Sequence, residues 1–395
     1  MSAAEFALAL PWLVAALLVP WVIRRRPRLS DFRLAAVAPP LSVVLPARNE
    51  AANLAACVGS LLSSAYPAFE IVIVDDGSTD GTGDIARELA RARPDRIRFV
   101  AGEPLPEGWV GKSWACWQGY GAARGEVLAF TDADTRHGPA LLGHAVAALQ
   151  VGDTALVAGF PRQVMRGFWE RLILPHVFTA IELRYHDMSR LNRSQKPRDA
   201  VANGQFMMFR RAAYEAIGGH RAVRGEIVED VRLAQHLVAS GHRLFAAWAQ
   251  DLIETRMYRS FREIVEGWTK NLARGSRHSV DPWLRPLLPW LVAAFQLAFW
   301  VAPTATLAAS FAGLDLPRSW AAAAVAASLA FWGVRHLHFG APLRYALLFP
   351  LGATLTALLF LRSALRGEKV MWRGRRYGAS STNSTSTRSG MRPAS

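Results

Sequence analysis

The sequence has little cysteine and relatively little acidic charge. Its 395 residues include two cysteines, Cys57 and Cys116. They fit neither a zinc-binding pattern nor a disulfide framework, so we expect buried small residues in a reducing compartment. Lys and Arg number 46 against 31 Asp and Glu, which gives a net charge of +15. A basic chain can bind nucleic acid, but no RNA- or DNA-binding motif occurs here, and no nucleic-acid partner is expected.

Charge is missing altogether from several long apolar runs. The first, residues 6–23, is just long enough to cross a bilayer. A secretory signal peptide carries its positive charges before the apolar stretch, whereas here they come after it. We therefore predict an uncleaved anchor over residues 1–26 with a cytosolic basic flank. Attraction to anionic lipid headgroups then explains the net positive charge. The basic flank consists of Arg24, Arg25, Arg26 and Arg28.

Three more apolar runs lie within residues 284–362, at 287–314, 319–334 and 345–361. Residues 363–395 form a basic tail with a Ser/Thr-rich end, which we expect to be disordered. Three full crossings would place this tail outside the cytosol, against the positive-inside rule. We therefore expect one run to be interfacial or re-entrant. The candidates are 319–334 and the front half of 287–314, which Pro289 and Pro303 interrupt.

Residues 41 to about 257 alternate between strand and helix patterns. Residues 41–46, 70–74, 97–100 and 127–130 are short apolar runs, typical of strands in a sheet covered on both faces. Helical spacing of apolar residues fills 49–65 and continues again towards residue 90. This alternation predicts an α/β domain with a mostly parallel sheet over residues 40–280.

Two glycine-rich nucleotide loops are missing from this domain. Gly111-Lys112-Ser113 resembles the end of a phosphate-binding loop, but that loop needs a glycine where Pro106 stands. The glycines between residues 77 and 83 also lack the Gly-x-Gly-x-x-Gly spacing of a dinucleotide fold. A P-loop ATPase and a dehydrogenase are therefore disfavoured.

Carboxylates stand instead at the predicted ends of two strands. Asp132 and Asp134 follow one strand, and Asp75 and Asp76 end another. Ligands of α/β sheets bind at this edge. Two hard oxygen ligands suit Mg²⁺ or Mn²⁺ bridged to a diphosphate, and the other pair can accept hydrogen bonds from a base or ribose. A lone Asp-x-Asp is a weak signal, because it is common in solvated turns.

Three further groups are expected near these carboxylates. Residues 46–50 end the first strand, and Lys112 lies where a cation can pair with phosphate. Glu229 and Asp230 open a helix that ends near Gly241. The histidines, His137 among them, show no ligand spacing and are expected to be scattered helix or surface residues. The consistency of the whole set indicates a nucleotide site built from carboxylates.

Together these segments resemble the family 2 glycosyltransferases with the GT-A fold, from residue 41 to about 272. The matching stretches are LSVVLPARNE at 41–50, VDDGSTD at 74–80, TDAD at 131–134 and the Glu229-Asp230 pair. Residues 105–115 are most similar to membrane-anchored enzymes associated with hopanoid and carotenoid biosynthesis. The membrane layout and residues 372–377 are also similar to ceramide glucosyltransferases.

The resemblance implies metal-dependent, inverting transfer of a sugar from a nucleotide sugar, most often UDP-linked. Asp134, with Asp132, would hold Mg²⁺ or Mn²⁺ on the diphosphate, and Asp230 would be the general base. Donor-binding residues would be Pro46, Ala47, Arg48, Glu50, Asp75, Asp76, Lys112 and Asp132. The acceptor and lid residues would be Asn203, Gly204, Glu229, Trp268, Trp372 and Arg375.

The same comparison bears on the acceptor. Processive polysaccharide synthases keep Gln-x-x-Arg-Trp near position 268, but only Trp268 matches here, so we expect single sugar additions. A site between membrane segments suggests a lipid acceptor such as a hopanoid, carotenoid or similar hydroxylated lipid. We expect a multi-pass protein of the cytoplasmic membrane with a cytosolic catalytic domain and no particular protein partner. A polyprenyl-phosphate sugar synthase and an inactive membrane scaffold stay open as alternatives.

Overall fold

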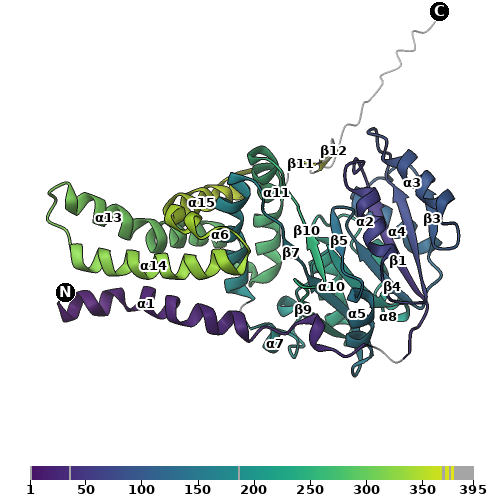
Figure 1. Ribbon diagram of the computed structural model, residues 1–395, viewed down its shortest axis with the longest axis horizontal. Coiled ribbons are helices and arrows are strands. Elements are labelled where there is room, and N and C mark those ends of the chain that lie inside the picture. Colours follow the sequence, from purple (N-terminus) through teal and green to yellow (C-terminus); the bar gives the residue numbers. More distant parts are fainter. Residues whose placement is uncertain (1, 35–36, 186, 367–369, 373–374, 378–395) are drawn as a thin grey trace, which may run out of the picture.

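The chain folds into an α/β domain and an arm of long helices (Figure 1). The computed structural model describes residues 2–34, 37–185, 187–366, 370–372 and 375–377. For residues 184, 273–274, 276–279, 370–372 and 375–377 it describes the backbone alone.

A seven-stranded sheet of order β3-β2-β1-β4-β8-β6-β9 is the centre of the α/β domain. Strand β8 is antiparallel to β4 and β6, while the other neighbouring strands are parallel. The predicted mostly parallel sheet is therefore confirmed, with β8 as its exception. The strands are β1 (Leu41–Ala47), β2 (Phe69–Asp75), β3 (Ile97–Ala101), β4 (Val127–Thr131), β6 (Thr154–Phe160), β8 (Phe206–Arg210) and β9 (Arg243–Trp248).

Alternate side chains of the strands enter two cores, one on each face of the sheet. Val43 packs with Cys57 of α2, whereas its neighbour Val44 packs with Cys116 of α4. Both cysteines are buried and free, as expected from their spacing. The first face carries α2 (Leu54–Leu62), α3 (Thr82–Ala92) and α5 (Leu141–Gln150). The other carries α4 (Gly111–Ala122), α8 (Arg211–Ala216), α9 (Gly219–Ala222) and α10 (Glu229–Ala239).

Two small sheets complete the β structure. One has the order β5-β10-β7 and brings a strand from near residue 254 beside the end of β4. The other pairs β11 with β12 after the last helix. Their strands are β5 (Thr135–His137), β7 (Arg162–Gln163), β10 (Ile253–Thr255), β11 (Val370–Trp372) and β12 (Arg375–Tyr377).

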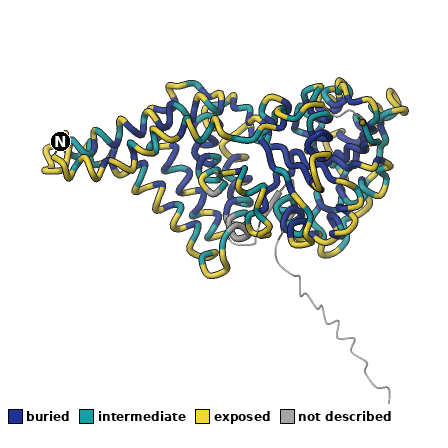
Figure 2. The backbone as a smooth tube through the Cα atoms, turned by 90° about the horizontal axis from the view of Figure 1, so that it is seen from below, coloured by how far each residue is buried: buried dark blue, intermediate teal, exposed yellow. Residues whose placement is uncertain are grey.

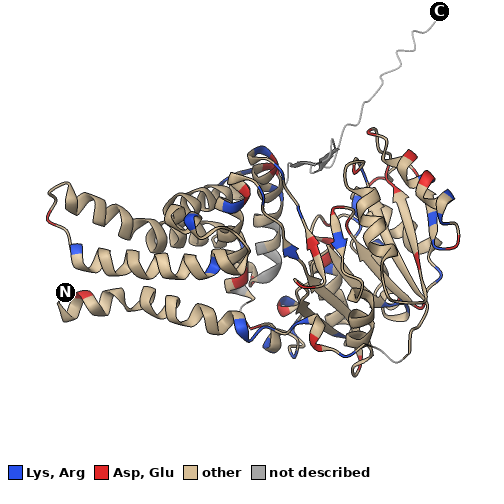
Figure 3. Cartoon of the chain, in the orientation of Figure 1, with Lys and Arg blue, Asp and Glu red and all other residues tan. Residues whose placement is uncertain are grey.

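The arm consists mainly of helices without charge along their middles (Figure 3). By length and composition, Ala3–Arg24, Leu288–Phe311 and Leu343–Arg366 could each cross a membrane. Large apolar side chains of α1, such as Leu17 and Trp21, are exposed. Figure 2 shows exposed positions along the helices at the N-terminal end of the molecule. The arm helices are α1 (Ala3–Arg24), α12 (Leu288–Phe295), η4 (Gln296–Val301), α13 (Ala302–Phe311), α14 (Arg318–His338), η5 (Leu343–Leu348) and α15 (Phe349–Arg366).

The helix 288–311 is continuous, so our expectation that two prolines interrupt its front half is wrong. Pro289 lies in the first turn of α12, where a missing N–H is tolerated. Pro303 lies in the first turn of α13, directly after the wide π-helical turn η4. A π-type turn in front of a proline relieves the clash that a proline causes inside a regular helix.

Helix α15 differs from the rest of the arm. Helices α1, α13 and α14 reach the far end of the arm, whereas α15 lies at the end next to the α/β domain (Figure 1). It packs there against α6 (Phe168–Arg184), α11 (Phe261–Ser279) and α12. The 319–334 run, one of our candidates for a re-entrant segment, lies within α14 and packs along α1. By length and composition α14 is not among the helices that could cross a membrane. The remaining short helices are η1 (Leu29–Asp31), α7 (Met188–Leu191), η2 (Pro197–Asp199) and η3 (Pro282–Leu284).

A buried ion-pair cluster joins the arm to the α/β domain. Glu182 of α6 lies 2.7 Å from Arg26, at the end of α1, and also pairs with Arg335 of α14. The Arg26 guanidinium stacks 4.4 Å above the ring of Trp248, the last residue of β9. Glu182 thus binds arginines of two arm segments, and one of these arginines, Arg26, also contacts β9. These contacts fix the arm relative to the sheet.

Candidate active site

A cavity of about 520 Å³ runs from the sheet edge into the base of the arm. Polar residues that follow β1, β2 and β4 line one end of it. Apolar residues of α11 and of the arm line the other end, together with the polar Lys270 and Asn271 of α11. The apolar ones include Trp268 and Leu272 of α11, Leu288 and Val292 of α12, and Phe360 of α15. The cavity therefore connects a charged site with a hydrophobic one.

The polar end contains most of the residues predicted for donor binding. Pro46 and Ala47 end β1, and the backbone N–H of Asp76 donates to the Ala47 carbonyl at 2.8 Å. The Arg48 guanidinium binds the carbonyls of Asp76 and Gly77, which pins the two strand ends together. The predicted donor residues on the cavity wall are Pro46, Ala47, Arg48, Glu50, Asp76, Lys112 and Asp132.

Asp75 departs from the prediction. It is absent from the cavity wall, and its carboxylate accepts a hydrogen bond from the Ser78 N–H at 3.2 Å. Its Oδ2 also lies against Gly83, where an added Cβ would come within 2.6 Å. Consecutive strand residues point to opposite sides, so only one of two adjacent carboxylates can face the cavity. In this structure Asp75 shapes the turn after β2, and Asp76 faces the cavity.

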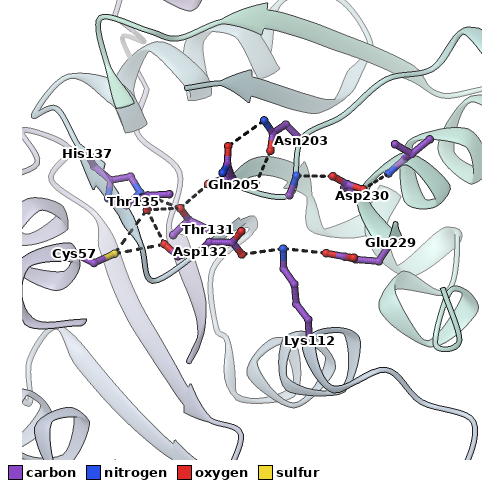
Figure 4. A network of polar contacts seen from close by, with 12 residues as sticks. Cys57, Lys112, Thr131, Asp132, Thr135, His137, Asn203, Gln205, Glu229 and Asp230 are labelled. Carbon is purple, nitrogen blue, oxygen red and sulfur yellow. Dashed lines mark hydrogen bonds and ion pairs between the residues drawn. The ribbon is translucent and has the colours of Figure 1, made fainter. Parts of the chain in front are cut away.

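Lys112 bridges two acidic residues across the polar end (Figure 4). Its Nζ lies 2.8 Å from Asp132 Oδ1 and 3.0 Å from Glu229 Oε1. Burial alone would lower the pKa of Lys112, but the carboxylates of Asp132 and Glu229 raise it well above its usual range. In return, Lys112 lowers the pKa of Glu229 against the effect of burial. Lys112 therefore joins the Asp-x-Asp segment to the start of α10.

Asp230 is held by two backbone N–H groups. Gly204 donates to its Oδ2 and Val231 to its Oδ1, both at 2.8 Å. Burial, and then the neighbouring Glu229 charge, raise the pKa of Asp230 to about 6, although Lys112 and the two hydrogen bonds oppose them. A carboxylate with such a pKa is suited to accept a proton near neutral pH.

Gly204 lies where these charged groups meet. A Cβ at this position would come within 2.7 Å of Lys112 Nζ and 3.3 Å of Glu229 Oε1. A larger residue at this position would push the Lys112 ammonium group away from its bridge, whereas glycine leaves room for it. This close approach explains the Asn-Gly-Gln sequence ahead of β8.

A buried polar network supports the Asp-x-Asp segment from behind (Figure 4). The Thr135 hydroxyl donates to the Asp132 carbonyl at 2.7 Å, and His137 Nε2 lies 2.9 Å from Thr131 Oγ1. Burial lowers the pKa of His137 to about 3, so the ring is neutral. The expectation of a scattered helix or surface histidine is wrong for His137, because it lies in β5. Its position three residues after Asp134 gave no signal of this role.

The acceptor-side predictions have mixed outcomes. Asn203, Gly204, Glu229 and Trp268 all line the cavity. Trp372 and Arg375 pair with each other in the β11–β12 hairpin, but their side chains lie outside the described part of the chain. Sequence reasoning gave no role to Gln163, which also lines the cavity. Its two-residue strand, β7, is too short to leave a periodic pattern.

Residues 42–218 match the family model described as Glycosyl transferase family 2. This segment, a little under half of the chain, is similar to the family 2 glycosyltransferases. It contains the ends of β1, β2 and β4, hence the donor half of the site, whereas Asp230 follows it in the chain.

Relatives and a solved structure agree with this assignment. The 4,4'-diaponeurosporenoate glycosyltransferases of Staphylococcus aureus strains MRSA252 and USA300 are 26% identical to the chain over 258 residues. The match covers 64% of this chain and 65% of each relative's own length. The mannosyltransferase PcManGT from Pyrobaculum calidifontis, solved with GDP-Man and Mn²⁺, has a TM-score of 0.52 at 22% identity. That comparison covers 92% of this chain and 97% of the other, and it shows the GT-A-like fold.

The candidate site offers few ligands for a metal ion. Asp132 and Asp134 line the cavity at the end of β4. Within the described residues, no group of three or more His, Cys, Asp or Glu side chains gathers to hold an ion. Mg²⁺ and Mn²⁺ are hard ions, and Mg²⁺ often binds through one or two carboxylates together with substrate phosphates. The donor set therefore fits such an ion when a diphosphate supplies further ligands.

Proposed function

We propose that the protein is a non-processive, inverting glycosyltransferase that moves a sugar from a UDP-linked nucleotide sugar to a hydroxylated membrane lipid. The observation that carries this proposal is the cavity that joins the carboxylate-lined sheet edge to the apolar residues of α11, α12 and α15. A soluble, polar acceptor would not bind the apolar part of this cavity. A lipid with a polar end fits both ends of this cavity.

The polar end is suited to a nucleotide diphosphate. Asp76 and Glu50 are buried acceptors for the base or ribose, and both line the cavity. Asp132 and Asp134 would hold Mg²⁺ or Mn²⁺ against the two phosphates. The bound ion would neutralise the negative charge that develops on the leaving nucleoside diphosphate. Lys112, already beside Asp132, adds a second positive charge at the same place.

The chemistry at the acceptor is a single displacement. The lipid hydroxyl oxygen forms a bond to the anomeric carbon while the bond from that carbon to the diphosphate oxygen breaks. Asp230 takes the hydroxyl proton, and the electron pair of the broken bond leaves with the nucleoside diphosphate. Attack from the side opposite the leaving group inverts the anomeric centre. The raised pKa of Asp230 makes its carboxylate a stronger base than an exposed aspartate.

The relatives support a carotenoid-type lipid as the acceptor, since they are named for 4,4'-diaponeurosporenoate, whose polar end is a carboxylate and not a hydroxyl. The apolar surface of α1 supports attachment to a membrane. A polyprenyl-phosphate acceptor would be ionised already and would need no base. An inactive scaffold would not need the Lys112 bridge between Asp132 and Glu229.

The test is release of nucleoside diphosphate by the detergent-purified protein. UDP-glucose, UDP-galactose and GDP-mannose are supplied in turn with Mn²⁺, with and without a lipid extract. We expect release with one donor, stimulated by lipid and abolished by EDTA. In the Asp132→Asn variant, release and Mn²⁺-dependent donor binding should both fall. The matched Asp95→Asn variant, changed at an exposed residue of the α/β domain, should behave as wild type. Lipid-independent activity, or no release with any donor, would contradict the proposal.

A further inference from the structure

Three amide side chains form a connected group beside Asp230. Gln163 Nε2 and Asn203 Nδ2 both donate to Gln205 Oε1, each at 3.2 Å. Gln205 and Gln163 are 4% and 9% exposed, respectively, and all three residues line the cavity. Gln205 directly follows Gly204, whose N–H binds Asp230 (Figure 4). The amide group therefore lies on the acceptor side of the candidate base.

One backbone N–H fixes the orientation of all three amides. The Gln205 N–H donates to Asn203 Oδ1 at 3.0 Å, so the other atom of the Asn203 amide must be its NH₂ donor. The Gln205 atom that faces this donor must therefore be its oxygen. The Gln163 atom that contacts the same oxygen must be an NH₂ group. The orientation of each amide thus follows from the hydrogen-bond network.

The backbone of Gln205 is fixed as well. Its carbonyl accepts a hydrogen bond from the Thr131 hydroxyl at 2.8 Å, and Thr131 belongs to the network behind the Asp-x-Asp segment. Its N–H is bound by Asn203. The side chain is thus held from the donor side and from the acceptor side, so its free end points in a defined direction.

Two polar atoms of this group remain available to a ligand. Within the described part of the chain, no hydrogen bond reaches Gln205 Nε2 or Gln163 Oε1. Neither atom is among the fully enclosed polar side-chain atoms that lack a partner, so both are accessible from the cavity, where a ligand atom can bond to them. The oxygen of a lipid hydroxyl can accept from Gln205 Nε2 while its own hydrogen faces Asp230.

The charges around this position disfavour an anionic acceptor. Glu229 and Asp230 are buried carboxylates at the start of α10, and Lys112 is already shared between Glu229 and Asp132. Among the described residues, the other two cations on the cavity wall are Arg48 and Lys270, and both already have partners within the protein. A phosphate or carboxylate acceptor would therefore enter next to the two carboxylates and would have to compete for a cation. A neutral hydroxyl carries no such penalty.

We infer that Gln205, oriented by Asn203 and Gln163, is a specificity-determining residue that selects an uncharged hydroxyl acceptor over a phosphate or carboxylate. This inference rests on the proposed lipid glycosyltransferase function. It adds the residue that binds the polar end of the acceptor, and it names the chemical class of that acceptor.

The experiment compares three isoprenoid acceptors that differ only in their polar end: geranylgeraniol, geranylgeranyl phosphate and geranylgeranoic acid. The donor is the nucleotide sugar that supports release. We expect the wild-type protein to transfer sugar to the alcohol alone. Gln205→Glu, which replaces the NH₂ donor by a charged oxygen, and Gln205→Leu should each raise KM for the alcohol about tenfold or more. The donor Kd should not change, which also shows that the variants are folded.

The matched control is Gln150→Glu, on the exposed end of α5, which should leave every constant unchanged. Transfer to the alcohol with an unaltered KM in both Gln205 variants would overturn the inference and leave the proposed function intact. Transfer to the phosphate or the acid by the wild-type protein would overturn it in the same way. Donor binding without transfer to any acceptor would remove the proposed function, and the inference with it.

Discussion

At the scale of single residues, the site depends on one lysine that forms ion pairs with two carboxylates. Lys112 contacts Asp132 on the donor side and Glu229 on the acceptor side, and Asp230 follows Glu229 directly. The pKa of Glu229 is lowered by this contact, whereas that of Asp230 is raised by burial and by Glu229. Two adjacent carboxylates therefore have different protonation behaviour, and the one with the higher pKa is the better base.

The first prediction concerns the pH dependence of transfer. A general base must be ionised, and the pKa of Asp230 is raised to about 6. Activity should therefore be constant above this pH and fall as the pH decreases through about 6. The Lys112 charge lowers the pKa of Asp230, so the residual activity of Lys112→Met should begin to fall at a higher pH. A pH profile of kcat/KM with saturating donor measures both effects.

The Asp230→Asn variant is the control for this profile. It keeps an oxygen that can accept the Gly204 N–H but cannot take a proton. Transfer should fall by about 10²- to 10⁴-fold, while donor binding by calorimetry stays unchanged. A variant that loses donor binding to the same extent would assign Asp230 a structural role. Substantial remaining transfer would instead favour an acceptor that is already ionised, as in a polyprenyl-phosphate sugar synthase.

Most of the cavity's polar residues could be predicted from the sequence, because strand ends in an α/β domain mark the ligand edge. Asp75 could not be separated from Asp76 in this way, since the direction of a side chain at a strand end depends on the turn that follows. The roles of His137 and Gln163 could not be predicted from the sequence either. Each acts through a contact with a segment far away in the chain. His137 contacts Ser60, and Gln163 contacts Gln205.

At the scale of elements, helix α15 forms part of the cavity wall through a close contact with α6. A Cβ at Gly352 would come within 2.4 Å of His176 Nε2 and 2.8 Å of the Leu172 carbonyl oxygen. Small residues allow such close approach between helices in membrane proteins. Phe360, two turns further along α15, lines the apolar end of the cavity. The position of this wall thus depends on one glycine.

The second prediction follows from this contact. Gly352→Ala should separate α15 from α6 and destabilise the protein by about 1–3 kcal/mol. Thermal unfolding in detergent measures this loss, and lipid-stimulated release should fall more than donor binding. Gly121→Ala is the matched control, because a Cβ at the end of α4 meets no atom within 4 Å. An unchanged melting temperature for Gly352→Ala would show that the two helices can move apart without cost.

Elements were predicted unevenly from the sequence. The strands β1 to β4 were found because their apolar runs are short and bounded by polar turns. The direction of β8 was not predicted, since it depends on the path of the chain through α6 and α7, not on strand composition. The effect of Pro289 was misjudged because a proline is harmless in the first turn of a helix. The effect of Pro303 was misjudged because the π-helical turn before it cannot be read from the sequence pattern.

At the scale of the whole molecule, the arrangement of the arm determines on which side of the membrane each end lies. Composition selects Ala3–Arg24, Leu288–Phe311 and Leu343–Arg366 as possible crossings. Geometry favours α14 over α15 as the third, because α14 packs along α1 to the far end of the arm while α15 stays at its base (Figure 1). We give more weight to the geometry, since neighbouring helices of similar length experience the same depth of bilayer. Each assignment has three crossings, with either α14 or 343–366 as the third. In both, residues that follow the third crossing would lie on the same side of the membrane as the α/β domain.

The final prediction separates the two assignments through residue 344, in the turn between α14 and α15. His338, at the end of α14, lies 3.2 Å from Arg26 at the end of α1, so this turn should face the cytosol with the α/β domain. If α14 did not cross and 343–366 did, the turn would lie outside.

The two native cysteines are buried, which allows labelling of single introduced cysteines. A membrane-impermeant maleimide applied to spheroplasts should label Asp315→Cys, at the far end of the arm. It should label Arg344→Cys, and the control Asp95→Cys, only after permeabilisation. Labelling of Arg344→Cys in intact spheroplasts would make 343–366 the crossing helix, and α14 the segment that stays on the outer side.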